Sequence, residues 1–310
     1  MIYAIIADVH GNCPALQAVI SDAKAKGAEG FLLLGDYIRD TPKSDEVADI
    51  IRKLPNCTAI IGNGDKGVLS LDDTKPERCA YEQMYPNFWA YHNLSTQNLD
   101  YLKSLKETAN ITLSNGKTLH LSHSIGLMYH TPRLGVFHSG DYARKMETQP
   151  FSFEEGMRDM QTAAEKYAHE VAEYQGDMCL YGHNHLQFLG SVGNKTLCNP
   201  GSCGQPLEYD TRAPYAIISD EGGEIEIELH RVEYDLDKTI SDIREFTGIP
   251  ELRIWVKLWT ALLKMGSDIA LIRFWQHARE LGGNSFPMED ELWRKVVATY
   301  QLDPAWEVQT

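Results

Sequence analysis

The stretch Ile2-Tyr3-Ala4-Ile5-Ile6-Ala7-Asp8-Val9-His10 decides the fold of this 310-residue chain. Its first six residues form a continuous apolar run, which predicts a β-strand covered on both faces, as in a parallel sheet. The run ends at Asp8, where polar side chains first appear. A helix is expected next, with Asn12 as its cap and Pro14 near its first turn.

Two further strands are predicted along the first third of the chain. The apolar runs are Gly-Phe-Leu-Leu-Leu at 30–34 and Thr-Ala-Ile-Ile at 58–61, with a helical pattern between them. The order strand, helix, strand, helix, strand with short loops predicts parallel pairing and right-handed crossovers. Open sheets of this kind bind ligands beyond the carboxyl ends of their strands. We therefore expect Asp8, Asp36 and Asn63 to meet at that edge.

The second half of the chain has a different pattern. Asn115-Gly116 lies between two apolar runs and is a type I′ hairpin signal. After a loop at 124–151, a capping box at 152–155 predicts a long helix to about Tyr174. A further buried strand is predicted at 178–181, and hairpin strands are predicted at 188–192, 195–198, 215–219 and 224–229. Together these elements predict an α/β fold in which two mixed β-sheets lie face to face between helices, an α/β/β/α sandwich.

The chain after about residue 240 is expected to be a separate helical extension. Apolar residues recur there at helical spacing, and five of the six tryptophans lie in it, namely Trp255, Trp259, Trp275, Trp293 and Trp306. We predict a catalytic domain at 1–240, with loop and helix 124–175 as a partial cap, and a helical extension at 241–310. The extension either packs on its own domain, which is favoured, or forms a homodimer interface, since tryptophan is enriched at interfaces.

Composition restricts the partners and the compartment. The net charge of −15 argues against non-specific binding to nucleic acid or to an anionic membrane. Six cysteines without a C-x-x-C pair predict reduced thiols in a cytoplasmic protein. The apolar start has no basic region before it and is too short for a signal peptide or a membrane span.

Five short polar segments follow predicted strands and carry the chemistry. They are Asp8-Val9-His10, Gly35-Asp36, Gly62-Asn63-Gly64-Asp65, Ser122-His123 and Gly182-His183-Asn184-His185. Each offers a hard oxygen or an imidazole nitrogen and none offers a thiolate, which suits Mn²⁺, Fe²⁺ or Zn²⁺ and excludes a cysteine-built zinc site. A single histidine after a strand is more often an ordinary hydrogen-bonded residue than a ligand. The five segments together are far more specific.

This series resembles the calcineurin-like metallophosphoesterases, whose pattern is D-x-H, G-D, G-N-H-[DE], H and G-H-x-H. The resemblance covers most of residues 1–235. It implies two divalent ions, one held by Asp8, His10, Asp36 and His185, and the other by Asp36, Asn63, His123 and His183. It also implies hydrolysis of a small phosphorylated substrate by a hydroxide that bridges the ions. Phosphodiesters, phosphomonoesters and nucleotide phosphoanhydrides all remain open as substrates. The catalytic centre would be formed by Asp36, Asn63 and His123.

Other activities remain open as alternatives. A nuclease or a protein Ser/Thr phosphatase would use the same metal motifs, although the acidic balance and the absence of a basic stripe count against a nuclease. A non-catalytic metal- or nucleotide-binding module with this fold is the third alternative.

The sequence departs from the family pattern at Gly64, where many relatives have a histidine that assists the leaving group. Either His130 or His138 supplies the proton, or the substrate has a leaving group of low pKa that needs none, such as a phenol or a phosphoanhydride. Both histidines are equally well explained as solvated loop residues. A second departure is Ser124, because the family usually has glycine after the histidine that corresponds to His123.

Arg39 is a candidate phosphate clamp. The segment at 35–39 is similar to one in protein Ser/Thr phosphatases, but Arg39 and Asp40 stand in swapped order relative to it. The alternative is a loop arginine that pairs with Asp40.

Overall fold

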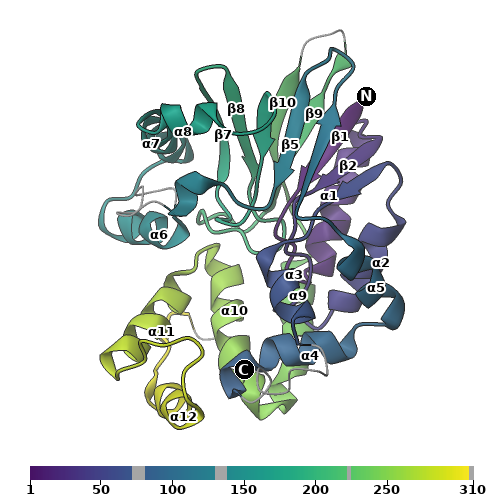
Figure 1. The fold of residues 1–310 in the computed structure, drawn as a ribbon. Helices are drawn as coiled ribbons and strands as arrows, with labels where there is room; N and C mark the ends of the chain where they lie inside the picture. The colour runs from purple at the N-terminus through teal and green to yellow at the C-terminus, as the bar shows by residue number, and fades with distance from the viewer. Residues whose placement is uncertain (72–80, 130–137, 222–224, 307–310) are drawn as a thin grey trace.

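Two five-stranded β-sheets lie face to face in the computed structural model, which describes residues 1–71, 81–129, 138–221 and 225–306 (Figure 1). The first sheet has the order β10-β9-β1-β2-β3 and the second β4-β5-β6-β8-β7. The first is built from β1 (Ile2–Ile6), β2 (Gly30–Leu33), β3 (Cys57–Ala59), β9 (Ala213–Ser219) and β10 (Glu226–Val232). The second is built from β4 (Thr108–Thr112), β5 (Thr118–Ser122), β6 (Met178–Leu180), β7 (Gln187–Val192) and β8 (Lys195–Pro200). The predicted sandwich of two mixed sheets is confirmed.

The first sheet pairs as the strand–helix alternation predicts. β1 runs parallel to β2, and β2 runs parallel to β3, while β9 joins the other side of β1 in the antiparallel direction. Residues 4–7 at the centre are completely buried. Burial on both faces explains why this strand is apolar at every position rather than at alternate ones. The carboxyl ends of β1 and β2 point toward the helices at the other end of the molecule (Figure 1).

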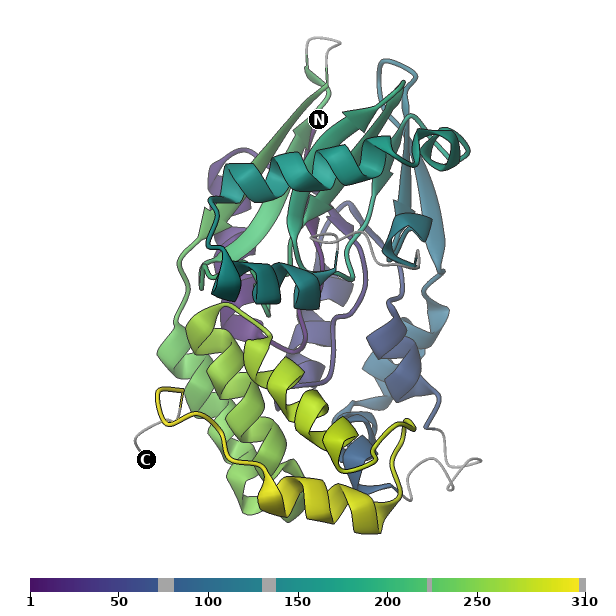
Figure 2. The ribbon, with the colours of Figure 1, turned by 90° about the vertical axis from the view of Figure 1, so that its left-hand side faces the viewer.

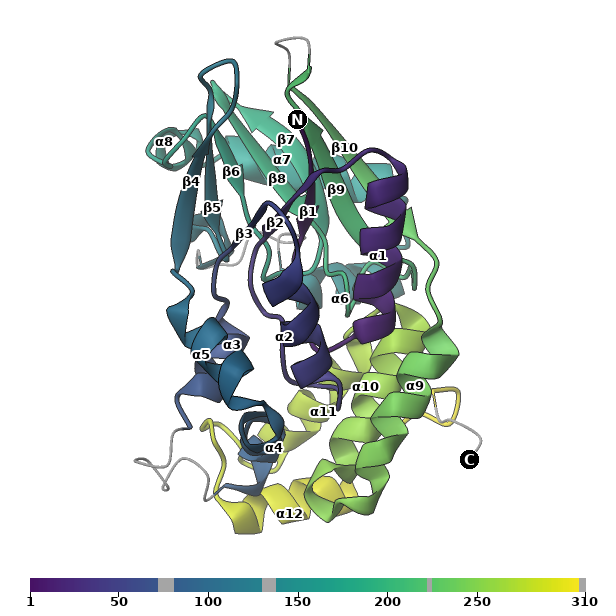
Figure 3. The same ribbon diagram turned by 90° about the vertical axis from the view of Figure 1, so that its right-hand side faces the viewer.

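Helices cover the outer face of each sheet. On the first sheet lie α1 (Cys13–Ala25), capped by Asn12 as predicted, and α2 (Ser44–Lys53) (Figure 3). α3 (Asn63–Leu69), η2 (Glu82–Met84), α4 (Tyr85–Asn93) and α5 (Thr96–Ser104) follow β3. η3 (Gly126–Tyr129) and α6 (Ser139–Thr148) lead to α7 (Phe153–Glu165) and α8 (Ala168–Ala172). Of these, α7 packs on β7 across the outside of the second sheet (Figure 2).

Two local predictions are wrong. The hairpin between β4 and β5 forms, but its turn is not type I′, because Gly116 has a φ of +82° and Asn115 is not left-handed. Instead, Gly116 N donates to Leu113 O over 3.0 Å, and Leu113 N donates to Lys117 O over 2.8 Å, which gives a longer loop. The helix predicted to reach Tyr174 is interrupted at Tyr167, where the backbone leaves helical geometry before α8.

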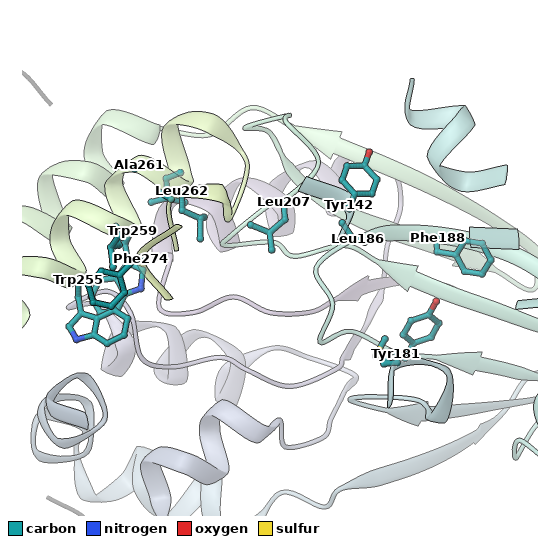
Figure 4. Close-up of a cluster of buried hydrophobic side chains, with 14 of the residues drawn as sticks. Tyr142, Tyr181, Leu186, Phe188, Leu207, Trp255, Trp259, Ala261, Leu262 and Phe274 are labelled. Carbon is teal, nitrogen blue, oxygen red and sulfur yellow. The ribbon is translucent and has the colours of Figure 1, made fainter. Parts of the chain in front are cut away.

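The C-terminal part is helical, with α9 (Leu236–Arg244), η6 (Glu245–Gly248), η7 (Pro250–Leu252), α10 (Arg253–Met265), α11 (Ile269–Glu280) and α12 (Asp290–Thr299). The boundary predicted at residue 240 falls inside α9. This helix packs on α1, and its Thr239 hydroxyl donates to Asn12 Oδ1 over 2.9 Å. Trp255, Trp259 and Trp293 are buried in one apolar cluster that continues into the second sheet. Figure 4 shows Trp255 and Trp259 at the helical end of this cluster and Phe188 at the sheet. These tryptophans are therefore buried within a single chain.

Further sequence predictions can be compared with the described part of the chain. Cys13, Cys57, Cys179, Cys198 and Cys203 are free thiols, and Cys79 lies outside the described residues. Among the helices of the described ranges, none combines the length and the apolar character needed to cross a membrane.

Candidate metal centre

The seven predicted metal ligands come together at the carboxyl ends of the strands. Ligand atoms of Asp8, His10 and His185 lie within 4.8 Å of one another, and so do those of Asp8, Asp36 and His123. The two remaining residues adjoin these groups. Asn63 Oδ1 lies 2.9 Å from His123 Nε2, and the His183 ring lies edge-to-face with the His123 ring at 5.2 Å between centroids.

The loops that carry the ligands have an unusual backbone conformation. Left-handed φ angles of 49–73° occur at Asp8, His10, Asp36, His183 and His185. Such angles are uncommon for residues other than glycine, and they cluster at functional sites, where the surrounding structure enforces them. Here Asp8 N donates to Gly35 O and His10 N donates to Asp36 O, each over 3.0 Å. The fold therefore maintains a costly conformation at five of the seven predicted ligands.

Three imidazoles are oriented by acceptors on their outer nitrogen. His10 Nδ1 lies 2.9 Å from Asp40 Oδ2, His123 Nδ1 lies 2.7 Å from the Leu34 carbonyl, and His185 Nδ1 lies 3.0 Å from the Gln205 carbonyl. Metal-bound histidines usually donate their second ring nitrogen to such acceptors. The Nε2 atoms consequently face the site, and those of His10 and His185 lie only 3.2 Å apart. This donor set fits a divalent metal.

One carboxylate lies between the two groups of histidines. Asp36 Oδ2 is 3.4 Å from His123 Nε2 and 4.0 Å from His10 Nε2. Asp8 Oδ1 is 3.6 Å from His185 Nε2, and the Asp8 carboxylate also accepts the backbone N–H of His183 at 3.0 Å. Asp36 can therefore reach imidazoles of both groups, as a ligand shared by two neighbouring cation sites requires.

Burial keeps two of the histidines neutral. The pKa of His183 is lowered to about 4 by burial and by the adjacent His123. The pKa of His185 is lowered to about 3 by burial and by His10. At neutral pH both imidazoles therefore have a free lone pair, which a metal ion requires.

The remaining charges form a coupled group. Burial raises the pKa of Asp8 to about 7, and the neighbouring His123 opposes this shift. The pKa of His123 is raised to about 10, because Asp36 outweighs the effect of burial. For the same reason the pKa of Asp36 stays well below its usual range in spite of burial. Without a metal, the site is stabilised by a proton on His123.

Asp65 fixes the loop that carries Asp36. Its carboxylate accepts four backbone N–H groups at 2.8–3.2 Å, those of Asp36, Tyr37, Ile38 and Gly62. The bond to Gly62 completes a capping box at the start of α3, so Asp65 also stabilises the start of this helix. Sequence reasoning missed the three bonds to residues 36–38, because they join segments far apart in the chain.

Gly64 approaches Asp36 closely. Gly64 N donates to Asp36 Oδ1 over 2.6 Å. A Cβ atom at position 64 would lie 3.1 Å from the carboxylate atoms of Asp36, which is tighter than an ordinary contact. The backbone at position 64 is helical, so the restriction comes from this contact.

The three candidate substrate residues, Arg39, His130 and His138, differ in their surroundings. Arg39 Nε donates to Asp40 Oδ1 over 2.8 Å, which is the pairing considered as the alternative to a phosphate clamp. His130 lies outside the described residues. His138 precedes α6, and its charge contributes to the lowered pKa of His183, so it adjoins the site.

Sequence reasoning considered Asp40 only as a partner of Arg39. Besides facing His10, its carboxylate accepts Gln205 Nε2 over 3.0 Å. Although burial opposes it, Arg39 and His10 lower the pKa of Asp40 to about 2. Asp40 thus stays ionised and orients His10. The only signal in the sequence was its place four residues after Asp36. Tyr129, whose ring lies 6.0 Å from that of His183, was also missed and had no signal.

Known proteins resemble this chain over most of its length. A model of the calcineurin-like phosphoesterase superfamily domain matches residues 1–222. An uncharacterized protein of Methanocaldococcus jannaschii is 29% identical over 258 residues, which are 77% of this chain and 90% of that protein.

Solved structures share the fold. A metallophosphoesterase from Sphaerobacter thermophilus has a TM-score of 0.57 and 24% identity, over 86% of this chain and 99% of its own. A hypothetical protein from Pyrococcus horikoshii OT3 has a TM-score of 0.58 and 19% identity, over 83% of this chain and 97% of its own. Because the family model spans well over half of the chain and its motifs converge on one site, the chain belongs to the calcineurin-like phosphoesterase superfamily.

Proposed function

We propose that this chain hydrolyses small phosphodiesters, phosphomonoesters or nucleotide phosphoanhydrides with two divalent ions, of manganese, iron or zinc. The superfamily implies metal-dependent phosphoester hydrolysis, and the number of ions and the substrate class go beyond what the superfamily implies. The observation that carries the proposal is the position of Asp36, whose Oδ2 lies 3.4 Å from His123 Nε2 and 4.0 Å from His10 Nε2, between the two groups of ligands. One ion would be held by Asp8, His10, Asp36 and His185, and the other by Asp36, Asn63, His123 and His183.

The ligand chemistry favours this assignment. Nitrogen and hard oxygen donors without a thiolate are suited to Mn²⁺, Fe²⁺ and Zn²⁺. Two such ions supply Lewis acidity toward a phosphoryl oxygen and offset the negative charge of the substrate. Asp40 and the Leu34 and Gln205 carbonyls keep the three imidazoles turned inward. The protein therefore contributes a preformed donor set rather than one that must assemble around the metal.

Among the described residues, the site offers few side chains that could protonate the leaving group. Gly64 has no side chain, and Arg39 is engaged by Asp40. His138 is the described titratable residue closest in role to the absent histidine, because it interacts electrostatically with His183. Leaving groups of low pKa, such as phenols and phosphoanhydrides, gain least from general acid catalysis. We therefore expect such substrates to be hydrolysed fastest.

The test is hydrolysis of bis(p-nitrophenyl) phosphate by metal-stripped protein to which Mn²⁺ is returned, with bound metal measured in parallel. We expect turnover that requires Mn²⁺ and is lost in Asp36→Asn. Asp49→Asn is the matched control, because Asp49 is an exposed aspartate on α2 that pairs only with Arg52 and Lys53 in the described structure. Two bound ions without turnover of any phosphoester would contradict hydrolysis and favour a binding module.

A further inference from the structure

An exposed tyrosine lies beside the candidate metal centre. Tyr129 is 62% exposed, and its ring centroid is 6.0 Å from that of His183, with the planes tilted by 38°. The His183 ring is in turn packed against His123. Three rings thus extend in series from the candidate ligands to the solvent. A large side chain so exposed at this place has no role in the apolar core.

The fold fixes the backbone that carries Tyr129. It ends the short helix η3, in which Leu127 and Met128 are buried in the core of the second sheet. Leu127 N donates to the Tyr174 hydroxyl over 3.1 Å, and this hydroxyl donates to Glu170 Oε1 over 2.6 Å. Because both preceding side chains are anchored inward, Tyr129 is held at the surface.

The hydroxyl of Tyr129 is also fixed. It donates to Ser124 Oγ over 2.9 Å, and Ser122 Oγ holds the same loop through the Ser124 carbonyl over 2.8 Å. Ser124 occupies the position where the family usually has glycine, and a glycine could not accept this bond. One end of the tyrosine ring is therefore tied to the residue that follows His123, while most of the side chain stays open to solvent.

The geometry points to Tyr129 as a stacking surface for a planar aromatic group of the substrate, a nucleobase or an aryl ring attached to the phosphate. This inference rests on the proposed function of the neighbouring site. Tyrosine stacks on planar rings with little loss of side-chain entropy, and it accepts different bases because every base has a π face. The absence of a side chain at Gly64 agrees with this substrate class. Phenolates, which leave from aryl esters, and nucleoside phosphates, which leave from nucleotide anhydrides, need little general acid catalysis.

The test compares phosphate ligands that differ only in the ring. Calorimetry on the Mn²⁺-loaded protein measures the dissociation constants of AMP against ribose 5-phosphate, and of phenylphosphonate against ethylphosphonate. We expect the wild-type protein to prefer the ring-bearing member of each pair. Tyr129→Leu should reduce this preference by about 5- to 150-fold, the range typical of one stacking contact. Tyr129→Phe should keep most of it, and Ser124→Gly should lower it by less than Tyr129→Leu.

Controls separate the outcomes. Phe286→Leu removes an exposed ring that contacts Trp275 in the C-terminal helices, and it should not change the preference. A preference for AMP alone identifies a nucleobase site, and a preference in both pairs identifies a site for any planar ring. The inference is overturned if the wild-type protein binds both members of each pair equally tightly, or if Tyr129→Leu keeps the preference. Either result counts against stacking even when phosphoesters are cleaved. A Tyr129-dependent preference without turnover would support stacking and contradict only the proposed hydrolysis.

Discussion

The metal-binding edge of the sheets and the C-terminal helices both bury side chains, but those at the edge are polar or charged and those in the helices are apolar. At the edge of the sheets, Asp8, His10 and Asp36 are almost fully buried charged or polar groups on a left-handed backbone. In the helices, Trp293 and Phe274 lie in a continuous apolar cluster. Burying an unpaired charge destabilises the folded state, whereas burying an aromatic ring stabilises it. The comparison indicates that the helical layer stabilises the fold while the metal edge is retained for chemistry.

The largest effect is expected from Asp36→Asn. Asp36 Oδ2 lies near histidines of both groups, so its loss affects both proposed cations. We expect activity to fall by more than about 100-fold, beyond the range seen for residues that only orient ligands. Asn63→Ala should cost less, because Asn63 serves one cation. The measurement is kcat with bound metal determined on the same samples. Similar, mild losses in both variants would contradict the two-metal assignment.

The helical layer should behave in the opposite way. Trp293 is 2% exposed, and its ring lies 5.7 Å from Trp255 and 5.5 Å from Phe274. Trp293→Ala should lower the free energy of unfolding by about 3–5 kcal/mol, as is typical for removal of a buried aromatic side chain. Metal content of the folded fraction should be unchanged. Denaturant unfolding checks this, with the exposed Phe286→Ala as the control. A loss of metal without a loss of stability would show that the helices support the site directly.

The homodimer through the C-terminal helices stays a prediction. Three of the five C-terminal tryptophans are buried inside the chain, so they are not available to a second copy. A dimer would have to use other residues of α10 to α12. Light scattering across a range of concentrations would measure the mass of the particle. A constant monomer mass would contradict the dimer.

Asp40→Asn is expected to have an intermediate effect on metal binding. Asp40 orients His10 and accepts a hydrogen bond from Gln205 Nε2, but it is not one of the proposed metal ligands. Loss of such a supporting carboxylate typically costs about 10- to 100-fold in metal affinity or activity. We expect weaker Mn²⁺ binding with the fold intact, measured by metal titration. Asp49→Asn is again the control. If Asp40→Asn binds Mn²⁺ as tightly as the wild-type protein, His10 is held in place by other contacts.

The difference between the two regions also explains what the sequence could predict. Alternation of strand and helix was sufficient to place Asp8, Asp36 and Asn63 at one edge. The resemblance to the family added His10, His123, His183 and His185 as ligands. The orienting contacts of Asp40 and Asp65 and the position of Tyr129 depend on segments far apart in the chain, and no local pattern encodes them. The apolar stripes predicted the C-terminal helices, but not the attachment of α9 to α1 through Thr239 and Asn12.

The local errors have physical causes of the same kind. Asn115-Gly116 favours a two-residue turn, but the hydrogen bonds of Leu113 select a longer loop in which only the glycine is left-handed. The capping box at Ser152 and Glu155 predicts where α7 begins and contains no information about where it ends. α7 ends at Glu165, and Tyr167, with φ of −115° and ψ of 28°, separates it from α8.

The last expected effect is the pH dependence of metal binding, and it arises only in the polar region. A metal must displace the proton of His123, whose pKa is about 10, and that of Asp8, whose pKa is about 7. His183 and His185, with pKa values of about 4 and 3, are already neutral above pH 5. The proton of His10 must be displaced as well, because, in spite of burial, Asp40 and Asp36 raise the pKa of His10. Affinity should therefore rise with pH, by up to about tenfold per unit for each proton released.

The stability of the metal-free protein should change in the opposite direction. The pKa of Asp8 is higher in the folded chain than in the unfolded chain, so the folded state keeps a proton between about pH 4 and pH 7 that the unfolded state releases. His123 stabilises the fold fully below its ordinary pKa of about 6.5, and this contribution is lost as the pH rises toward about 10. The increase in Tm caused by Mn²⁺ should consequently be larger at pH 8 than at pH 6. Calorimetry in buffers of different ionisation enthalpy counts the released protons. His123→Asn should remove one of them. His120→Asn should remove none, because His120 lies on β5, before His123, with its ring bonded to Asn110. A metal affinity that does not vary with pH would contradict the displacement of a proton from His123.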